Sequence, residues 1–155
     1  MKVEIYSRKA IEAMIEGQFP QNTAVISFYS PKASRRGDYA PVDYRGRPAR
    51  AFFMCAHDID IDALDDFGLT YETYMPDVKE LAAFIEKAAA DGMDIICQCD
   101  YGQSRSAACA AAISEHFFGT GIRIFADYRY YPNQLVFNKI YEALEGYDRE
   151  RRGVE

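Results

Sequence analysis

Apolar positions follow two different periods along the chain, and together they predict an α/β domain. Short runs rich in β-branched and aromatic residues predict strands at 2–7, 23–29, 51–56 and 93–98. Apolar residues at helical spacing predict helices at 8–16, 76–90, 104–118 and 132–144. Strands that alternate with helices are typical of a single domain with a mostly parallel central sheet flanked by helices.

Residues at the ends of the predicted helices support these boundaries. Ser7 is a candidate cap for the first helix, which Gly17 would end. Pro76 suits a first helical position, and Gly146 would follow the end of the last helix. In that last helix the inward-facing residues are expected to be Leu135, Val136, Ile140 and Leu144.

Composition narrows the classes of partner. The chain has 155 residues, with 18 Lys and Arg against 24 Asp and Glu, which gives a net charge of −6. Such an acidic protein is a poor binder of nucleic acid or anionic membranes, so neither is expected as a partner. The sequence shows no signal peptide and no apolar run of the ~20 residues that a membrane span needs. Four cysteines without a disulfide-like spacing indicate reduced thiols and a cytoplasmic location.

Residues 30–50 break the apolar pattern and are expected to form a loop. The segment has three prolines, two glycines and a net charge of +4 within an acidic chain. It is either a solvated loop or a cationic flap for an anionic ligand. Its basic residues are Lys32, Arg35, Arg36, Arg45, Arg47 and Arg50.

Residues 96–109, ICQCDYGQSRSAAC, join the fourth predicted strand to an alanine-rich helix. Cys99 follows the strand, five residues make a tight turn, and Arg105 lies in the first turn of the helix. Gly102 supplies the backbone freedom that such a turn needs. Successive amides followed by a helix N-terminus form a cup for a tetrahedral oxyanion, which the guanidinium of Arg105 can close.

The same positive field favours a thiolate at Cys99. A thiolate beneath a bound phosphoryl group is positioned to attack phosphorus and form a phosphocysteine. Ser106 could donate a hydrogen bond to the sulfur and so improve it as a leaving group. The spacing of cysteine and arginine therefore couples a nucleophile to an anion site.

This motif, C-x5-R-S with glycine third after the cysteine, resembles the cysteine-dependent protein tyrosine phosphatase superfamily, most closely its small dual-specificity and bacterial-type branches. The resemblance implies a catalytic domain over 1–148, with a frayed tail at 149–155. It implies hydrolysis of phosphotyrosine, with phosphoserine and phosphothreonine as further substrates, in a phosphorylated protein or a small phosphomonoester. No cofactor and no metal are expected. The implied phosphate-binding residues are Asp100, Tyr101, Gly102, Gln103, Ser104 and Arg105.

Two residues depart from the family pattern. Gln98 stands where the family usually has histidine, and Asp100 adds a carboxylate next to Cys99. They keep a second hypothesis open, a catalytically impaired module that only binds phosphate groups. A third keeps the chemistry but takes a nucleotide or an RNA 5′-phosphate as substrate. The turn lacks the lysines of phosphoinositide-selective relatives, which disfavours inositol lipids.

The resemblance also implies a general acid on a loop that precedes the nucleophile. Asp58 directly follows the stretch AFFMCAH, which contains the third predicted strand, and is the favoured candidate, although its separation of 41 positions from Cys99 is long for the family. The alternatives that remain open are Asp60, Asp62, Asp65 and Asp66.

Other polar and aromatic residues give weaker predictions. Cys97 and Cys99 are expected on opposite faces of their strand, and no cysteine or histidine pair has the spacing of a metal site. Cys55 is either a buried packing residue or a resolving thiol for Cys99. His116 is expected to be structural. Candidates for a substrate pocket wall are Tyr71, Tyr74, Tyr101 and Tyr128.

Overall fold

Four strands form the central sheet of the computed structural model, which describes residues 1–32 and 39–153. All strand pairs are parallel, and the strands lie in the order β1-β4-β2-β3. Their bounds are Val3–Ser7 for β1, Thr23–Tyr29 for β2, Arg50–Cys55 for β3 and Asp94–Cys99 for β4. The predicted α/β class and parallel sheet are therefore confirmed.

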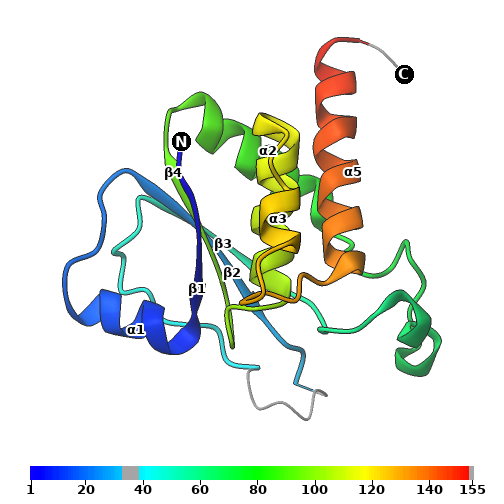
Figure 1. Cartoon of the computed structure of the whole chain (residues 1–155), viewed down its shortest axis with the longest axis horizontal. Coiled ribbons are helices and arrows are strands. Elements are labelled where there is room, and N and C mark those ends of the chain that lie inside the picture. Colours follow the sequence, from blue (N-terminus) through cyan, green and yellow to red (C-terminus); the bar gives the residue numbers. More distant parts are fainter. Residues whose placement is uncertain (33–38, 154–155) are drawn as a thin grey trace.

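Helices cover both faces of this sheet (Figure 1). Helix α1 (Arg8–Glu16) lies on one face, while α2 (Val78–Ala90), α3 (Arg105–Phe118) and α5 (Gln134–Arg151) lie on the other. The main core fills the space between the sheet and the three helices, and a smaller core lies beneath α1. Strand β2 is buried along most of its length because it lies between β4 and β3 and is covered on both faces.

The cap of α1 and the small side chains of α3 show how particular residues determine these two helices. The Ser7 hydroxyl accepts a hydrogen bond from the Ala10 amide, so the predicted cap of α1 is confirmed, and Gly17 follows its last residue. Helix α3 buries every residue from Arg105 to Ile113 because it contacts the sheet on one side and α5 on another. Its small alanine side chains let these neighbours approach closely.

Several predicted boundaries are wrong. Helix α2 begins at Val78, so Pro76 precedes it rather than opening it. Helix α5 continues through Gly146 to Arg151, into the residues predicted as a frayed tail. Residues Glu145 and Asp148 contact His116 of α3, and these tertiary contacts offset the helix penalty of glycine. Three short elements were not predicted: η1 (Ile61–Ala63), η2 (Asp65–Phe67) and α4 (Ile122–Phe125).

The described part of the 30–50 segment is anchored to the scaffold. Val42 and Tyr44 are buried in the smaller core beside α1. Arg45 pairs with Glu16, Arg47 donates to the Gly17 carbonyl, and Arg50 pairs with Asp91. These three arginines do not form a flap over the strand ends, so that reading is wrong for them. Arg35 and Arg36 lie outside the described residues.

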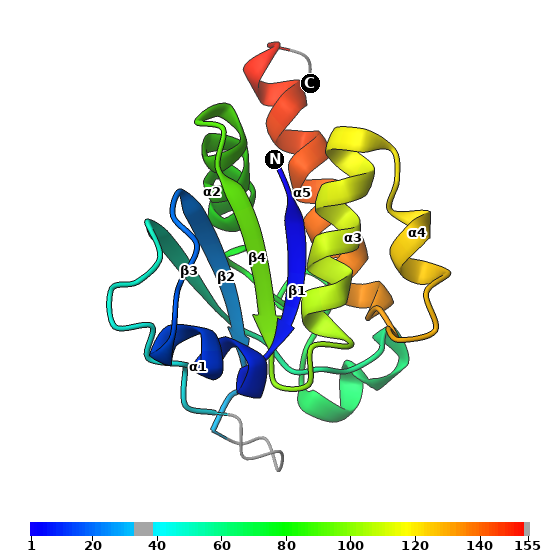
Figure 2. The same ribbon diagram turned by 60° about the vertical axis from the view of Figure 1, so that its left-hand side comes forward.

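The parallel arrangement brings the carboxyl ends of all four strands to one edge. Ser7 pairs with Cys99, and Tyr29 pairs with Cys55. The β4–α3 turn and the segment that contains η1 and η2 both lie at this edge (Figure 2). Ligand sites of parallel sheets form at such an edge. Within the described parts of the chain, none of the helices is both long and apolar enough to span a bilayer.

Candidate active site

The turn from Cys99 to Arg105 is held in shape by donors that lie outside it. The Asp100 carbonyl accepts from the Arg8 amide over 3.0 Å, and the Gln103 carbonyl accepts from the Tyr131 amide over 2.8 Å. The Ser104 carbonyl accepts from the amides of Asn133 and Ala108. Each peptide here is trans, so its N–H points opposite to its C=O. Carbonyls fixed outward therefore turn the amides of the next residues toward the inside of the turn.

Amides of this turn remain available for a ligand. Among the residues that the structure describes, those of Asp100, Gly102, Gln103 and Ser104 make no hydrogen bond. Ser104 precedes α3, and its side chain makes no capping hydrogen bond to the helix. The Ser104 amide, which the held Gln103 carbonyl turns inward, and the other unbonded amides of the turn lie at the N-terminus of a fourteen-residue helix, an arrangement that can bind an oxyanion.

Gly102 is required at this position for two reasons. Its φ of +69° lies in the left-handed region, which is costly for other residues. A Cβ at this position would also lie 2.6 Å from the backbone nitrogen of Ser7. The turn therefore packs directly against the β1–α1 junction, which only glycine permits.

Cys99 ends β4 at the base of the turn and is 3% exposed. Its Sγ lies 3.0 Å from Oγ of the buried Ser106. This contact places the predicted hydroxyl within hydrogen-bonding distance of the sulfur.

Arg105 brings a buried positive charge to the same site. Its side chain is 1% exposed, and Nη1 donates to the Ser30 hydroxyl and to the Ala56 carbonyl, each over 2.9 Å. A guanidinium stays protonated even when it is buried. Its field extends beyond the turn, because burial and the charge of Arg105 together lower the pKa of His57.

Asp58 contacts the turn directly. Its Oδ1 accepts from the Ser104 hydroxyl over 2.7 Å and from Nδ2 of Asn133 over 2.9 Å. Asp60 lines the cleft beside it, whereas Asp62 belongs to η1 and Asp65 and Asp66 to η2. The separation of 41 positions is accommodated because η1 and η2 form a local excursion after Asp58.

Four residues hold the segment that carries Asp58 against the turn. Ser104 donates to Asp58 and Arg105 donates to the Ala56 carbonyl, as described above. The Tyr74 hydroxyl donates to the His57 carbonyl, and Nδ2 of Asn133 donates to the Ile59 carbonyl over 3.0 Å. Sequence reasoning assigned Asn133 only to a helix start and missed Ser30. Neither could be found from a local pattern, because their partners are distant in sequence.

A cleft of about 600 Å³ opens beside Asp58 and Ser104. Its lining also includes Phe125, Tyr130, Tyr131 and Pro132. The four tyrosines predicted for a pocket wall do not line it. Tyr71 donates to Glu142, Tyr74 is buried, and Tyr101 and Tyr128 are exposed on the surface.

Comparison of the sequence with protein-family models and with curated proteins gives no match. Solved structures do match the fold. A crystal structure of PTPMT1 in complex with PI(5)P is 12% identical, has a TM-score of 0.55, and the match covers 97% of this chain and 94% of that one. Human DUSP28 is 15% identical with a TM-score of 0.51, over 96% and 94% of the two chains. A human tyrosine phosphatase-like serine/threonine/tyrosine-interacting protein is 17% identical with a TM-score of 0.52, over 91% and 86%.

The chain has the fold of the cysteine-dependent protein tyrosine phosphatases. The predicted fold class and the resemblance are thereby confirmed. In this phosphatase fold, the C-x5-R-S motif begins at Cys99, the last residue of β4, crosses the turn and ends at Arg105 and Ser106, the first residues of α3.

The other thiols of this phosphatase fold lie in two environments. Cys97 and Cys99 share a face of β4, because residues two apart on a strand point to the same side, so the opposite-face prediction is wrong. Both lie near Cys109, where burial and the Cys97 thiol raise the pKa of the Cys109 thiol. Cys55 is exposed, which contradicts its reading as a buried packing residue.

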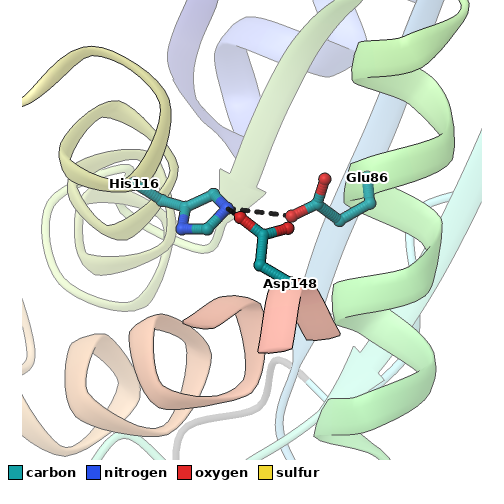
Figure 3. Close-up of side chains that lie close together, drawn as sticks. All are labelled: Glu86, His116 and Asp148. Atoms are coloured by element: carbon teal, nitrogen blue, oxygen red, sulfur yellow. Dashed lines mark hydrogen bonds and ion pairs between the residues drawn. The ribbon is translucent and has the colours of Figure 1, made fainter. Parts of the chain in front are cut away.

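A polar cluster joins helices α2, α3 and α5 (Figure 3). Nε2 of His116 lies 2.8 Å from Oε1 of Glu86 and 3.3 Å from Oδ2 of Asp148, and Nδ1 lies 2.9 Å from Oε1 of Glu145. The ligand atoms of Glu86, His116 and Asp148 are close enough to hold a metal ion. An imidazolium ion among three carboxylates accounts for the same geometry, and it fits the structural role predicted for His116.

Proposed function

We propose that the chain is a phosphomonoesterase that works through a phosphocysteine. The observation that carries the proposal is the turn itself. Donors outside the turn hold its carbonyls, the amides of residues 100 and 102–104 make no hydrogen bond within the described parts of the chain, and the buried Arg105 follows Cys99 by six positions. Such a site binds a phosphate dianion and places its phosphorus above a nucleophile.

The geometry supports a two-step reaction. The Cys99 thiolate attacks phosphorus, the S–P bond forms, and the ester P–O bond breaks while Asp58 gives a proton to the leaving oxygen. Water then attacks phosphorus and loses a proton to the Asp58 carboxylate. The S–P bond breaks, inorganic phosphate leaves, and Ser106 donates to the departing sulfur at its 3.0 Å contact. Arg105 and the amides of residues 100–105 hold the phosphoryl oxygens.

The cleft supports a substrate with an aromatic leaving group, such as the phenol of phosphotyrosine. Phe125, Tyr130 and Tyr131 offer ring faces and edges next to Asp58. Phosphoserine, phosphothreonine and small phosphomonoesters are narrower and also fit beside these rings. PTPMT1 was crystallised with PI(5)P, so an inositol lipid belongs in any substrate test despite the absence of lysine from the turn.

The test is a phosphatase panel at pH 5–8 with the purified protein and its Cys99→Ser variant. The panel contains p-nitrophenyl phosphate, phosphotyrosine, phosphoserine and phosphothreonine peptides, phosphatidylinositol 5-phosphate, a nucleoside 5′-monophosphate and a 5′-phosphorylated RNA. We expect hydrolysis of the aryl phosphates by the wild type and none by Cys99→Ser. A wild-type protein that hydrolyses nothing in the panel would contradict the proposal.

One observation favours a second candidate, a module that binds phosphate groups without turning them over. Gln98, next to the nucleophile, has no ionisable group. Tight binding of a phosphopeptide by a wild type that lacks activity would select this candidate.

A further inference from the structure

Gln98 is the last residue before the nucleophile and is 1% exposed. A buried amide needs partners for both its oxygen and its nitrogen. Oε1 accepts hydrogen bonds from the Ser27 hydroxyl and, over 2.8 Å, from the Tyr44 hydroxyl. Nε2 donates to the Cys99 carbonyl over 3.0 Å. Only this orientation of the amide satisfies all three contacts, because a carbonyl can accept but cannot donate.

The Cys99 carbonyl belongs to the first peptide of the turn. Fixing its direction also fixes the opposite direction of the Asp100 amide, since the peptide is planar and trans. Asp100, Gln103 and Ser104 have carbonyls that are held by backbone amides. The first peptide differs, because a side chain sets its orientation.

The hydroxyls of Ser27 and Tyr44 orient the Gln98 side chain. Ser27 comes from β2, beside Gln98 in the sheet, and Tyr44 comes from the buried part of the 30–50 segment. By filling both acceptor positions of Oε1, they leave Nε2 to face the Cys99 carbonyl. Arg8 provides a second link between the same parts, because its amide donates to the Asp100 carbonyl and its guanidinium to the Ala40 carbonyl over 2.6 Å.

We propose that Gln98 is a positioning residue that aims the Asp100 amide at the bound oxyanion, and that Tyr44 acts through it. This inference rests on the proposed oxyanion site but not on turnover. Gln98 stands where the family usually has histidine. Its uncharged side-chain amide orders the first peptide of the turn.

The test measures tungstate binding by calorimetry, beside p-nitrophenyl phosphate turnover and melting temperature, for the wild type, Gln98→Met, Tyr44→Phe and the double variant. The matched control is Gln18→Met, at an exposed glutamine. A hydrogen bond to a charged group contributes about 1.5–3 kcal/mol, so Gln98→Met should weaken tungstate binding roughly 10- to 100-fold. Tyr44→Phe should weaken it about threefold, the factor of a weaker and indirect contact. In the Gln98→Met background Tyr44→Phe should change the tungstate Kd no further, which is the signature of action through Gln98.

Each outcome decides between the claims. Lower melting temperatures with an unchanged tungstate Kd in both single variants would show a merely structural network and overturn the inference. If Gln98→Met fails to fold, the Tyr44→Phe Kd decides alone, and a wild-type value overturns the inference. A wild type that binds tungstate but hydrolyses no ester would contradict the proposed function, and the tungstate Kd values of the variants would then decide the inference on Gln98. A wild type that does not bind tungstate overturns both.

Discussion

Nδ2 of Asn133 donates a hydrogen bond to Oδ1 of Asp58 over 2.9 Å, across 75 positions of sequence. The same residue caps α5, because its Oδ1 accepts from the Val136 amide. One side chain therefore starts the last helix and fixes the carboxylate that faces the turn, and the two roles can be separated by substitution.

Asn133→Ser should keep the cap and lose the contact with Asp58, because serine caps helices about as well as asparagine. We expect kcat for an alkyl phosphate, a poor leaving group, to fall about tenfold, since a less ordered acid transfers its proton less effectively. Asn133→Ala is the comparison. It loses both the contact with Asp58 and the helix cap, so besides the fall in kcat its free energy of unfolding should be lower by about 1 kcal/mol. Steady-state kinetics and chemical unfolding measure the two effects. An unchanged kcat in Asn133→Ser would argue against the positioning of Asp58 by Asn133.

Asp58→Asn should lower kcat for poor leaving groups by about 10²–10⁴-fold, which is the usual contribution of positioned proton transfer. In kcat/KM, which reports the first step alone, the loss should be much smaller for p-nitrophenyl phosphate, because nitrophenolate leaves without a proton. Asp60→Asn is the matched control, since Asp60 lines the same cleft. The measurement is kcat/KM against leaving-group pKa for both variants. A larger loss in Asp60→Asn than in Asp58→Asn would assign the acid to Asp60.

Gly102→Ala should disrupt the turn more than its backbone angle alone requires. The new Cβ would lie 2.6 Å from the Ser7 nitrogen, so β1 and the turn must move apart. Gly119→Ala is the matched control, because its φ of +67° is nearly the same but its Cβ would meet no atom within 4 Å. The control should lose about 1–2 kcal/mol of stability and keep full activity. Gly102→Ala should lose more stability and most of its kcat/KM, and equal stability losses in the two variants would contradict this packing.

These contacts show which parts of the site a sequence can reveal. The nucleophile, the arginine and the glycine lie within seven positions, so their spacing alone predicts the turn. Asp58, the proposed acid, can be singled out in the sequence because it lies three positions after the end of β3. Asn133, Ser30 and the aromatic wall of the cleft depend on contacts between distant segments. The end of α5 was missed for the same reason, because contacts with His116 carry the helix past Gly146.

The cluster in Figure 3 predicts a pH-dependent stability. Burial alone would lower the pKa of His116, but hydrogen bonds to Glu145 and Glu86 and the charges of Glu86 and Asp148 raise it above its ordinary value of 6.5. Burial and Asp148 raise the pKa of Glu86. For both groups the folded state holds its proton more tightly than the unfolded state. Their contribution to stability is therefore fully present below the unfolded pKa and is lost as the pH rises through the folded one.

Unfolding in urea at several pH values measures this contribution. Above pH 6.5, the free energy of unfolding of the wild type should fall as the pH rises. His116→Gln should show a flatter dependence, because glutamine keeps hydrogen-bonding capacity without titrating. A wild-type stability that rises with pH in this window would contradict the imidazolium assignment.

The central claim is that Cys99 forms a bond to phosphorus inside the β4–α3 turn. The most direct measurement is acid quenching of the wild type during turnover of p-nitrophenyl phosphate, followed by peptide mass spectrometry. The account predicts a phosphoryl group on the peptide at Cys99 and none in Cys99→Ser treated in the same way. Turnover by the wild type with no phosphoryl group on Cys99, or continued hydrolysis by Cys99→Ser, would contradict it.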